Sequence, residues 1–246
     1  MAEPPLYDRI GVTYSTTRRE EPRIAARIHR ALGDPRSVVN VGAGAGAYEP
    51  RDRDVIAVEP SAVMIAQRPP GAARVIQARA EELPLADDSV DAAMAILSDH
   101  HWEDRAGGLR EMRRVARGPV VLFTYDPSLA DSFWFIRDYL PGFHHLAGMT
   151  LEQIAAALGG ARFETVPIPH DCRDGFFLSF WRRPHAYLDD RVRAGTSVFA
   201  RVTERETEDA VERLRADLDS GAWEERNREL LELEELDVGL RLVVSE

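Results

Sequence analysis

Short apolar runs recur along the first half of the chain and alternate with segments of helical periodicity. The apolar runs predict five strands, at residues 37–41, 54–59, 74–77, 90–97 and 119–124. Helices are expected at residues 22–32, 62–67 and 107–117. Apolar strands that alternate with helices are typical of an α/β fold whose parallel sheet is covered on both faces.

The pattern loosens after residue 125. It predicts an aromatic helix at 129–140, a helix at 150–158, a sixth strand at 161–168, an acidic helical segment from about 175 to 236 and a closing strand at 238–245. We expect one domain over residues 1–246, because a chain of this length that is 44% hydrophobic can bury one substantial core. Helical inserts at about 126–149 and 172–236 should leave the carboxyl ends of the strands and cover a pocket there as a lid.

Composition narrows the choice of partner and compartment. The net charge of −11 argues against nucleic acid, whose binding rests on a basic patch. All 31 basic residues are arginine, which excludes chemistry on a protein lysine. No stretch is long and apolar enough to span a membrane, the N-terminus lacks the order of a secretory signal, and the lone Cys172 cannot form an internal disulfide. We expect a cytoplasmic protein.

The glycine ladder in VVNVGAGAGAYEP, residues 38–50, is the first candidate site. Gly42, Gly44 and Gly46 follow the first strand, where an open α/β sheet binds its ligands. Glycine there permits a tight turn and lets a ligand contact the main chain. A purely structural turn is the alternative, and Gly42, Gly44 and Ala47 also satisfy the dinucleotide fingerprint G-x-G-x-x-A.

Glu59 ends the second predicted strand, close to this ladder. Its carboxylate could accept hydrogen bonds from both hydroxyls of a ribose, each worth about 1.5–3 kcal/mol. A solvated glutamate at the end of a strand is the alternative. The first interpretation predicts a cofactor that contains adenosine, whether or not that cofactor is a dinucleotide.

Three further segments decide between the cofactors. They are ARAEELPLADDSVDAAMAIL (78–97), SDHHW (98–102) and LREMRRVARGPVVLFTY (109–125). With them, the chain from Val38 to Tyr125 resembles the class I S-adenosylmethionine-dependent methyltransferases, especially the ubiquinone and menaquinone biosynthesis branch. The resemblance implies S-adenosylmethionine as cofactor and a Rossmann-like, mostly parallel sheet of order 3-2-1-4-5-7-6, with the last strand antiparallel. An NAD(P)-dependent oxidoreductase would leave the three segments unexplained.

The resemblance also implies a set of cofactor-binding residues. The set is Tyr14, Arg18, Asn40, Gly42, Ala43, Gly44, Gly46, Glu59, Pro60, Ala80, Glu81 and Ser98. The glycines would lie against the methionine and ribose, and Glu59 would hold the ribose diol. Ala80 would offer its backbone N–H to the adenine. Glu81 would reach the exocyclic amine, unless it is an exposed loop acid.

Two residues depart from the family's pattern. Asn40 stands where the family usually has an acid, which weakens the expected contact to the cofactor's ammonium group. Arg79 stands where an aspartate often precedes the Ala-Glu pair, which leaves adenine recognition to the main chain. In the N-terminal segment, Arg18 would clamp the cofactor carboxylate and Tyr14 would cover the methyl group. An ordinary surface arginine is the alternative for Arg18.

The histidine pair after the fourth strand supplies the candidate catalytic residues, His100 and His101. Histidine suits a general base at neutral pH, although methyl transfer needs mainly alignment and the exclusion of water. The alternative is that His101 and Trp102 pack beneath the next helix while Asp99 caps it.

Other polar clusters offer less. His144 and His145 are expected at the surface or in the lid. His170 and Cys172 lie near the same rim, but no further ligands occur at zinc-like spacing, so no metal site is predicted.

Aromatic residues concentrate in both inserts and bear on the methyl acceptor. They are Phe133, Trp134, Phe135, Tyr139 and Phe143 in the first insert and Phe176, Phe177, Phe180, Trp181 and Tyr187 in the second. In a lid they indicate a small apolar or aromatic acceptor. The alternatives are that they form the inserts' own core or a homodimer contact. At the level of function, the competing hypothesis is a catalytically inert S-adenosylmethionine-binding partner protein.

Overall fold

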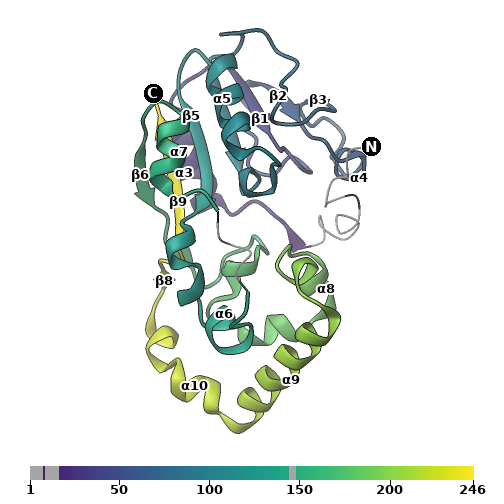
Figure 1. The fold of residues 1–246 in the computed structure, drawn as a ribbon, viewed down its shortest axis with the longest axis vertical. Helices are drawn as coiled ribbons and strands as arrows, with labels where there is room; N and C mark the ends of the chain where they lie inside the picture. Colours follow the sequence, from purple (N-terminus) through teal and green to yellow (C-terminus); the bar gives the residue numbers. More distant parts are fainter. Residues whose placement is uncertain (1–7, 9–16, 144–147) are drawn as a thin grey trace.

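The computed structural model describes residues 8, 17–143 and 148–246, and seven strands of this part form one sheet (Figure 1). They are β1 (Ser37–Val41), β2 (Asp54–Val58), β3 (Arg74–Ile76), β4 (Ala92–Ile96), β5 (Val120–Tyr125), β6 (Arg162–Thr165) and β9 (Leu240–Ser245). The order is β3-β2-β1-β4-β5-β9-β6. The first five strands are parallel, and β9 is antiparallel to β5 and β6. The predicted fold class and strand order are confirmed, with β9 as the closing strand.

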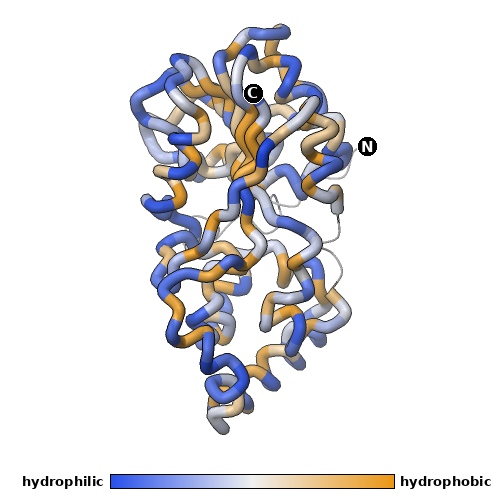
Figure 2. Tube along the Cα trace, turned by 90° about the vertical axis from the view of Figure 1, so that its left-hand side faces the viewer, coloured by the Kyte–Doolittle hydropathy of each residue, from blue (hydrophilic) through white to orange (hydrophobic). Residues whose placement is uncertain are grey.

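Both faces of the sheet are covered. Val38 packs on the side of α3 (Pro22–Leu32), whereas its neighbour Val39 packs with α5 (Arg105–Val115) and α7 (Leu151–Ala157). Successive side chains of a strand point to opposite faces, so a strand between two helix layers must be apolar throughout. Figure 2 shows the resulting hydrophobic segments running through the sheet.

Side-chain caps set where the helices begin. Ser61 caps the short α4 (Ala62–Ala66) by accepting from the N–H of Met64, and Thr150 starts α7 with a capping box. The predicted helix at 107–117 begins two residues earlier, because Asp104 accepts a hydrogen bond from the N–H of Gly107 at 2.8 Å. Satisfying these N–H groups stabilises the first turn of a helix.

The inserts form a helical lobe, drawn below the sheet in Figure 1. The first insert holds η3 (Pro127–Ser132) and α6 (Trp134–Tyr139). The second holds η4 (Phe177–Phe180), η5 (Pro184–Leu188), α8 (Asp190–Ala194), η6 (Phe199–Arg201), α9 (Glu204–Ser220), α10 (Ala222–Arg226) and η7 (Arg228–Glu232).

The single helix predicted at 129–140 is therefore divided into η3 and α6, and the helical segment predicted from about 175 to 236 consists of several separate helices. Phe133 is extended and separates η3 from α6. Gly221, at φ 77°, ends α9 in the left-handed conformation that favours glycine.

A second small sheet joins the two ends of the second insert. The predicted strand at 161–168 ends at Thr165, and the chain then forms β7 (Ile168–Pro169), which pairs antiparallel with β8 (Glu235–Leu236). This pairing holds the start and the end of the insert together. No helix in the described residues is long and apolar enough to cross a membrane.

The aromatic residues of the inserts mostly pack on one another. The ring of Trp134 lies 5.1 Å from that of Trp223 and 5.6 Å from that of Tyr187, and Phe135 lies 4.3 Å from Tyr187. All ten predicted lid aromatics are buried. The structure thus favours the alternative that most of them form the inserts' own core.

Candidate active site

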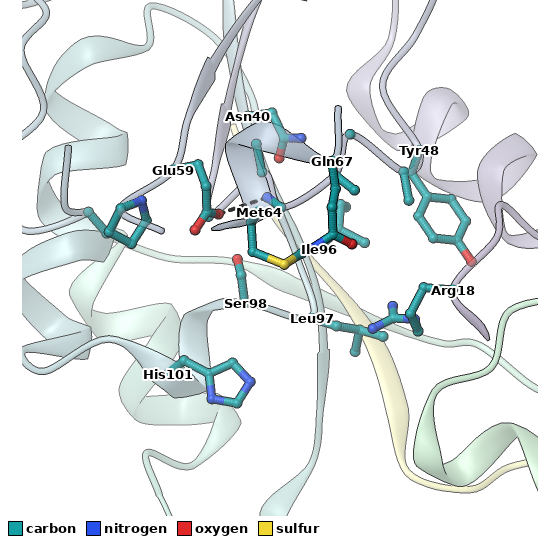
Figure 3. A pocket seen from close by; sticks show the side chains of 18 of the residues that line it. Arg18, Asn40, Tyr48, Glu59, Met64, Gln67, Ile96, Leu97, Ser98 and His101 are labelled. Atoms are coloured by element: carbon teal, nitrogen blue, oxygen red, sulfur yellow. Dashed lines mark hydrogen bonds between the residues drawn. The ribbon is translucent and has the colours of Figure 1, made fainter. Parts of the chain in front are cut away.

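A cavity of about 1060 Å³ opens at the carboxyl ends of β1, β2 and β4 (Figure 3). The predicted site residues that line it are Arg18, Asn40, Gly42, Ala43, Gly44, Gly46, Glu59, Pro60, Ala80, Glu81, Ser98 and His101. His100 instead lines a second chamber of about 70 Å³. Tyr14, His144 and His145 lie outside the described residues.

The loop after β1 turns on its glycines. Gly42, Gly44 and Gly46 have φ angles of 68°, 53° and 92°, in the left-handed region that other residues rarely adopt. A Cβ at Gly42 would also lie 2.6 Å from the Cβ of Ser98, so any side chain is excluded there. The N–H of Gly42 donates to the carbonyl of Val58 at 2.8 Å, which fixes the loop to the end of β2. The loop therefore presents main chain to the cavity.

Glu59 is not a solvated acid, because it is only 5% exposed. Its Oε2 accepts from the N–H of Gly44 at 2.8 Å, and its Oε1 accepts from the N–H of Ser61 at 2.9 Å. Burial raises the pKa of Glu59, although these two N–H groups and the nearby charge of Arg68 oppose the rise. Each carboxylate oxygen keeps a lone pair that can accept from a ligand hydroxyl.

Asn40 lies in a polar network at the end of β1. Its Nδ2 donates to Glu49 Oε1 at 3.1 Å, and Arg68 Nη2 donates to both oxygens of the same carboxylate at 2.9 and 2.7 Å. The Oδ1 of Asn40 is buried and has no hydrogen-bond partner among the described residues. Figure 3 shows the Asn40 amide directed toward the cavity. Because an unsatisfied buried acceptor is costly, Oδ1 is suited to a donor on a ligand.

Arg18 binds the insert rather than lying at the surface. Its side chain is 9% exposed and forms a two-pronged ion pair with Asp174, at 2.6 Å from Nε and 3.1 Å from Nη2. Tyr48 donates from its hydroxyl to the same carboxylate at 2.9 Å. The alternative of an ordinary surface arginine is therefore wrong. This cluster ties the N-terminal segment to both the glycine loop and the second insert.

The histidine pair lies on η2 (Asp99–His101), with ring centroids 3.9 Å apart. Arg201 Nη2 lies 3.0 Å from Nδ1 of His101. A guanidinium only donates, so Nδ1 must accept and the proton of the neutral ring must sit on Nε2. Insert residue Arg201 therefore selects the tautomer of His101.

Burial and positive charge hold both imidazoles neutral. Burial, helped by Arg105, Arg201 and Arg18, lowers the pKa of His100 to about 3. Burial, His100 and the arginines likewise lower the pKa of His101 far below its usual range. A general base works best with a pKa near the operating pH, so these environments suit hydrogen bonding more than proton removal.

Asp99 does not cap α5, because Asp104 takes that position. Asp99 is fully buried and pairs with Arg105, whose Nε donates to Oδ2 at 2.8 Å, and Thr124 donates to the same oxygen at 3.2 Å. Trp102 does pack beneath α5, as the alternative predicted. Its ring lies so close to Gly108 of that helix that a Cβ at Gly108 would be 2.4 Å from it. Trp102 also lines the cavity.

Comparison with known proteins identifies the family. A model described as a methyltransferase domain matches residues 39–123. A solved structure described as a methyltransferase from an antibiotic biosynthesis pathway of Anabaena variabilis is 34% identical, with a TM-score of 0.87 over 94% of this chain and 99% of that one. The chain belongs to the class I S-adenosylmethionine-dependent methyltransferases. The cofactor of this methyltransferase is S-adenosylmethionine.

More distant structures share the fold. A phosphoethanolamine N-methyltransferase of Haemonchus contortus is 14% identical, with a TM-score of 0.52 over 90% of this chain and 51% of that one. A geranyl diphosphate methyltransferase is 16% identical, with a TM-score of 0.50 over 91% and 76%. No match was found among curated protein sequences. The sheet of this methyltransferase also differs from that of the dinucleotide-binding fold, whose strand order is 3-2-1-4-5-6, because the antiparallel β9 lies between β5 and β6.

Sequence reasoning missed several residues of the methyltransferase cavity. They are Tyr48, Met64, Gln67, Leu97, Trp102 and Arg201. Tyr48 and Leu97 have φ angles of 68° and 50°, which is unusual for bulky residues and typical of functional sites. No pattern in the sequence marks that strain. Trp102 is the exception, because its position directly after the histidine pair could have predicted that it lines the cavity.

Of the remaining predicted residues, Arg79 and Glu81 line the large cavity, whereas His170 and Cys172 line neither cavity. Glu81 Oε1 accepts from the N–H of Asp104 at 3.2 Å, and Arg79 pairs with Glu103 at 2.5 Å. His170 lies 3.3 Å from Glu234, and Cys172 is buried. Within the described residues, no group of three or more potential ligands could hold a metal ion.

Proposed function

We propose that this methyltransferase transfers the methyl group of S-adenosylmethionine to a small-molecule acceptor held between the large cavity and the second chamber. The observation that carries the proposal is their adjacency, since Arg18 and Leu97 line both. The large cavity slightly exceeds the about 300–1,000 Å³ usual for small-molecule sites. It has room for the cofactor, and the chamber adjoins it where an acceptor would be needed.

Main-chain atoms and two side chains would hold the cofactor. The glycine loop would receive the methionine and ribose, with Glu59 accepting from the ribose hydroxyls. Asn40 Oδ1, the orphaned acceptor, fits a donor such as the cofactor's ammonium group. Asn40 thus replaces the family's usual acid with a neutral acceptor, while Glu49 beside it is neutralised by Arg68. Ala80 would contribute its backbone N–H to the adenine.

The second chamber would receive the acceptor. Its lining residues are Arg18, Leu97, His100, Tyr125, Phe176, Phe177, Leu178, Gly195, Thr196, Ser197, Val198 and Leu240. Only two of the lid aromatics, Phe176 and Phe177, reach it, so the apolar character of the acceptor rests on these and the aliphatic residues. A small metabolite is supported by the antibiotic pathway of the Anabaena variabilis relative. A quinone-like acceptor, as in the ubiquinone and menaquinone branch, is one such molecule.

Catalysis would depend on alignment. The cofactor supplies an activated methyl group, and the protein positions the acceptor and excludes water. The insert closes the site through the Arg18–Asp174 pair. His101, a donor through Nε2, and His100, at the chamber wall, would orient the acceptor.

Two measurements test the proposal. Calorimetry with S-adenosylhomocysteine should show binding that Glu59→Ala weakens about 10-fold to 100-fold, or about 1.4 to 2.7 kcal/mol. Glu82→Ala, an exposed acid of the neighbouring loop, is the matched control. Incubation with labelled cofactor and a panel of phenols, quinones and hydroxylated polyketides should label at least one acceptor. Wild-type affinity in Glu59→Ala would remove Glu59 from the site, and binding without any transfer would favour an inert partner protein.

A further inference from the structure

Arg201 is a cation that lines the large cavity, and the described residues do not balance its charge. It ends η6 in the second insert and lines the large cavity. Its one hydrogen bond in the described part of the chain is to His101 Nδ1, a neutral acceptor. No carboxylate among the described residues pairs with it.

The two neighbouring arginines are different. Arg18 is neutralised by Asp174, and Arg105 by Asp99, and both aspartates are fully buried. Placing a cation in a partly desolvated cavity without a counter-charge is unfavourable. The contrast indicates that the counter-ion of Arg201 comes with a ligand.

The second chamber supplies no such counter-ion. It contains no aspartate or glutamate among its lining residues, and its walls are mostly apolar. The sulfonium of the cofactor would add a further positive charge beside it. Electrostatics at the point of transfer therefore favour a negatively charged acceptor over a neutral or cationic one.

Among the described residues, neither the histidine pair nor Tyr125 is suited to deprotonate a neutral acceptor at pH 7. Nδ1 of His101 is engaged by Arg201, and its Nε2 already carries the proton. The pKa of His100 is about 3, and burial raises that of Tyr125 to about 12. An acceptor that arrives ionised needs no base.

We propose that the methyl acceptor is a singly charged oxyanion, a phenolate or carboxylate on a small apolar body, which pairs with Arg201 and is itself the nucleophile. The inference rests on the proposed function. A lone pair of the oxyanion forms the new bond to the methyl carbon, and the carbon–sulfur bond breaks with its electron pair returning to sulfur. The sulfonium and the oxyanion both become neutral, and no proton moves.

Arg201 would also extend the pH range in which a phenol acceptor is ionised. Among the described residues, the charged groups that act on His100, His101 and Tyr125 are Arg18, Arg105, Asp99 and Arg201, and Arg18 is paired with Asp174. The two ion pairs cancel, and the histidines and the tyrosine are neutral at pH 7, so Arg201 provides the net charge. A positive charge lowers the pKa of a nearby acid.

Binding tests the inference without turnover. In the presence of S-adenosylhomocysteine at pH 8, benzoate and 4-nitrophenolate should bind at least 10-fold more tightly than benzamide and nitrobenzene. Arg201→Gln should reduce this ratio to near one, and Arg201→Lys should keep part of it. Arg205→Gln is the matched control, because it removes an arginine four residues away whose side chain is 90% exposed. Comparing the affinities of benzoate and 4-nitrophenolate shows whether the site prefers a carboxylate or a phenolate.

Several results would overturn the inference. They are equal binding of anion and neutral analogue, the absence of anion binding, or a ratio that survives in Arg201→Gln. A 10-fold loss of S-adenosylhomocysteine affinity in Arg201→Gln with an unchanged ratio would instead make the cofactor carboxylate the partner of Arg201. Anion binding through Arg201 without methyl transfer to any acceptor would leave the inference standing and contradict the proposed function.

For any phenol that is methylated, the pH dependence of kcat/KM gives a second readout. The rise should begin at lower pH in the wild type than in Arg201→Gln, by about one unit for a 10-fold effect. An unshifted profile would count against the inference, since a purely structural arginine would change the amplitude alone.

Discussion

The two ends of the active site are built in different ways. The proposed cofactor end comes from neighbouring segments, with β1, the glycine loop and the end of β2 all within residues 37–61, and it presents mainly backbone groups. The proposed acceptor end combines residues from the N-terminal segment, the segment after β4, β5 and the second insert, and it depends on an ion pair and a hydrogen bond between distant residues. Local backbone geometry thus shapes the first end, and long-range charge pairing shapes the second.

Breaking a buried ion pair at the acceptor end should have the largest effect. Arg105→Gln leaves the fully buried Asp99 without its cation, which should cost about 3–5 kcal/mol of the free energy of unfolding. The melting temperature should fall by about 6–20 °C. The control is Arg110→Gln, because the side chain of Arg110 lies on the same helix but is 63% exposed. This variant should leave the melting temperature nearly unchanged. Equal melting temperatures for the two variants would contradict the importance of this pair.

At the cofactor end, a side chain on the loop should act on binding. Gly42→Val should reduce affinity for S-adenosylhomocysteine at least about 100-fold, because φ is 68° and Ser98 occupies the space of the new Cβ. Calorimetry measures the loss, and thermal unfolding shows whether the fold persists. The matched control is Gly142→Val, where nothing lies within 4 Å. Retained affinity would mean that the loop tolerates a side chain.

The raised pKa of Glu59 predicts how cofactor binding depends on pH. Ribose hydroxyls donate to the ionised carboxylate, so the complex holds the proton of Glu59 more weakly than the free protein does. Affinity should therefore fall as pH drops through the free protein's pKa, which lies above the usual 4.5, by about 10-fold per pH unit below it. Calorimetry from pH 4.5 to 8 measures this. Glu59→Gln should flatten the curve, and a slope that persists in this variant would assign it to another group.

The smallest effect is expected at His101. His101→Gln keeps an acceptor for Arg201 and a donor for the acceptor site, so kcat should change less than about 3-fold if the residue only orients. The pH profile between 6 and 8 should also be unchanged, since burial keeps the pKa of His101 far below this window. A loss of 100-fold or more, with a changed profile, would show that His101 removes a proton.

Much of the sheet lobe could be predicted because its signals are local. Pro22 and the apolar face of α3, the buried strands and the glycine loop each depend on residues close together in sequence. The closing strand β9 was also predicted from its apolar run, whereas its antiparallel place in the sheet followed from the family resemblance. The insert lobe was predicted only as an aromatic helix and a helical, acidic segment, because its composition does not show breaks such as the extended Phe133. Likewise, neither the partner of Arg18 nor the reach of Arg201 has a local pattern.

By itself, the sequence determined the α/β fold, the strand order through the family resemblance, and the grouping of Gly42, Gly44 and Glu59 in one cavity. Hydrophobic periodicity and backbone conformation act over a few residues, so they can be read along the chain. Only the tertiary structure decided which aromatic residues reach the chamber, which arginines are neutralised and which tautomer His101 adopts. These depend on residues as far apart as 101 and 201, whose proximity is set by the packing of the insert on the sheet.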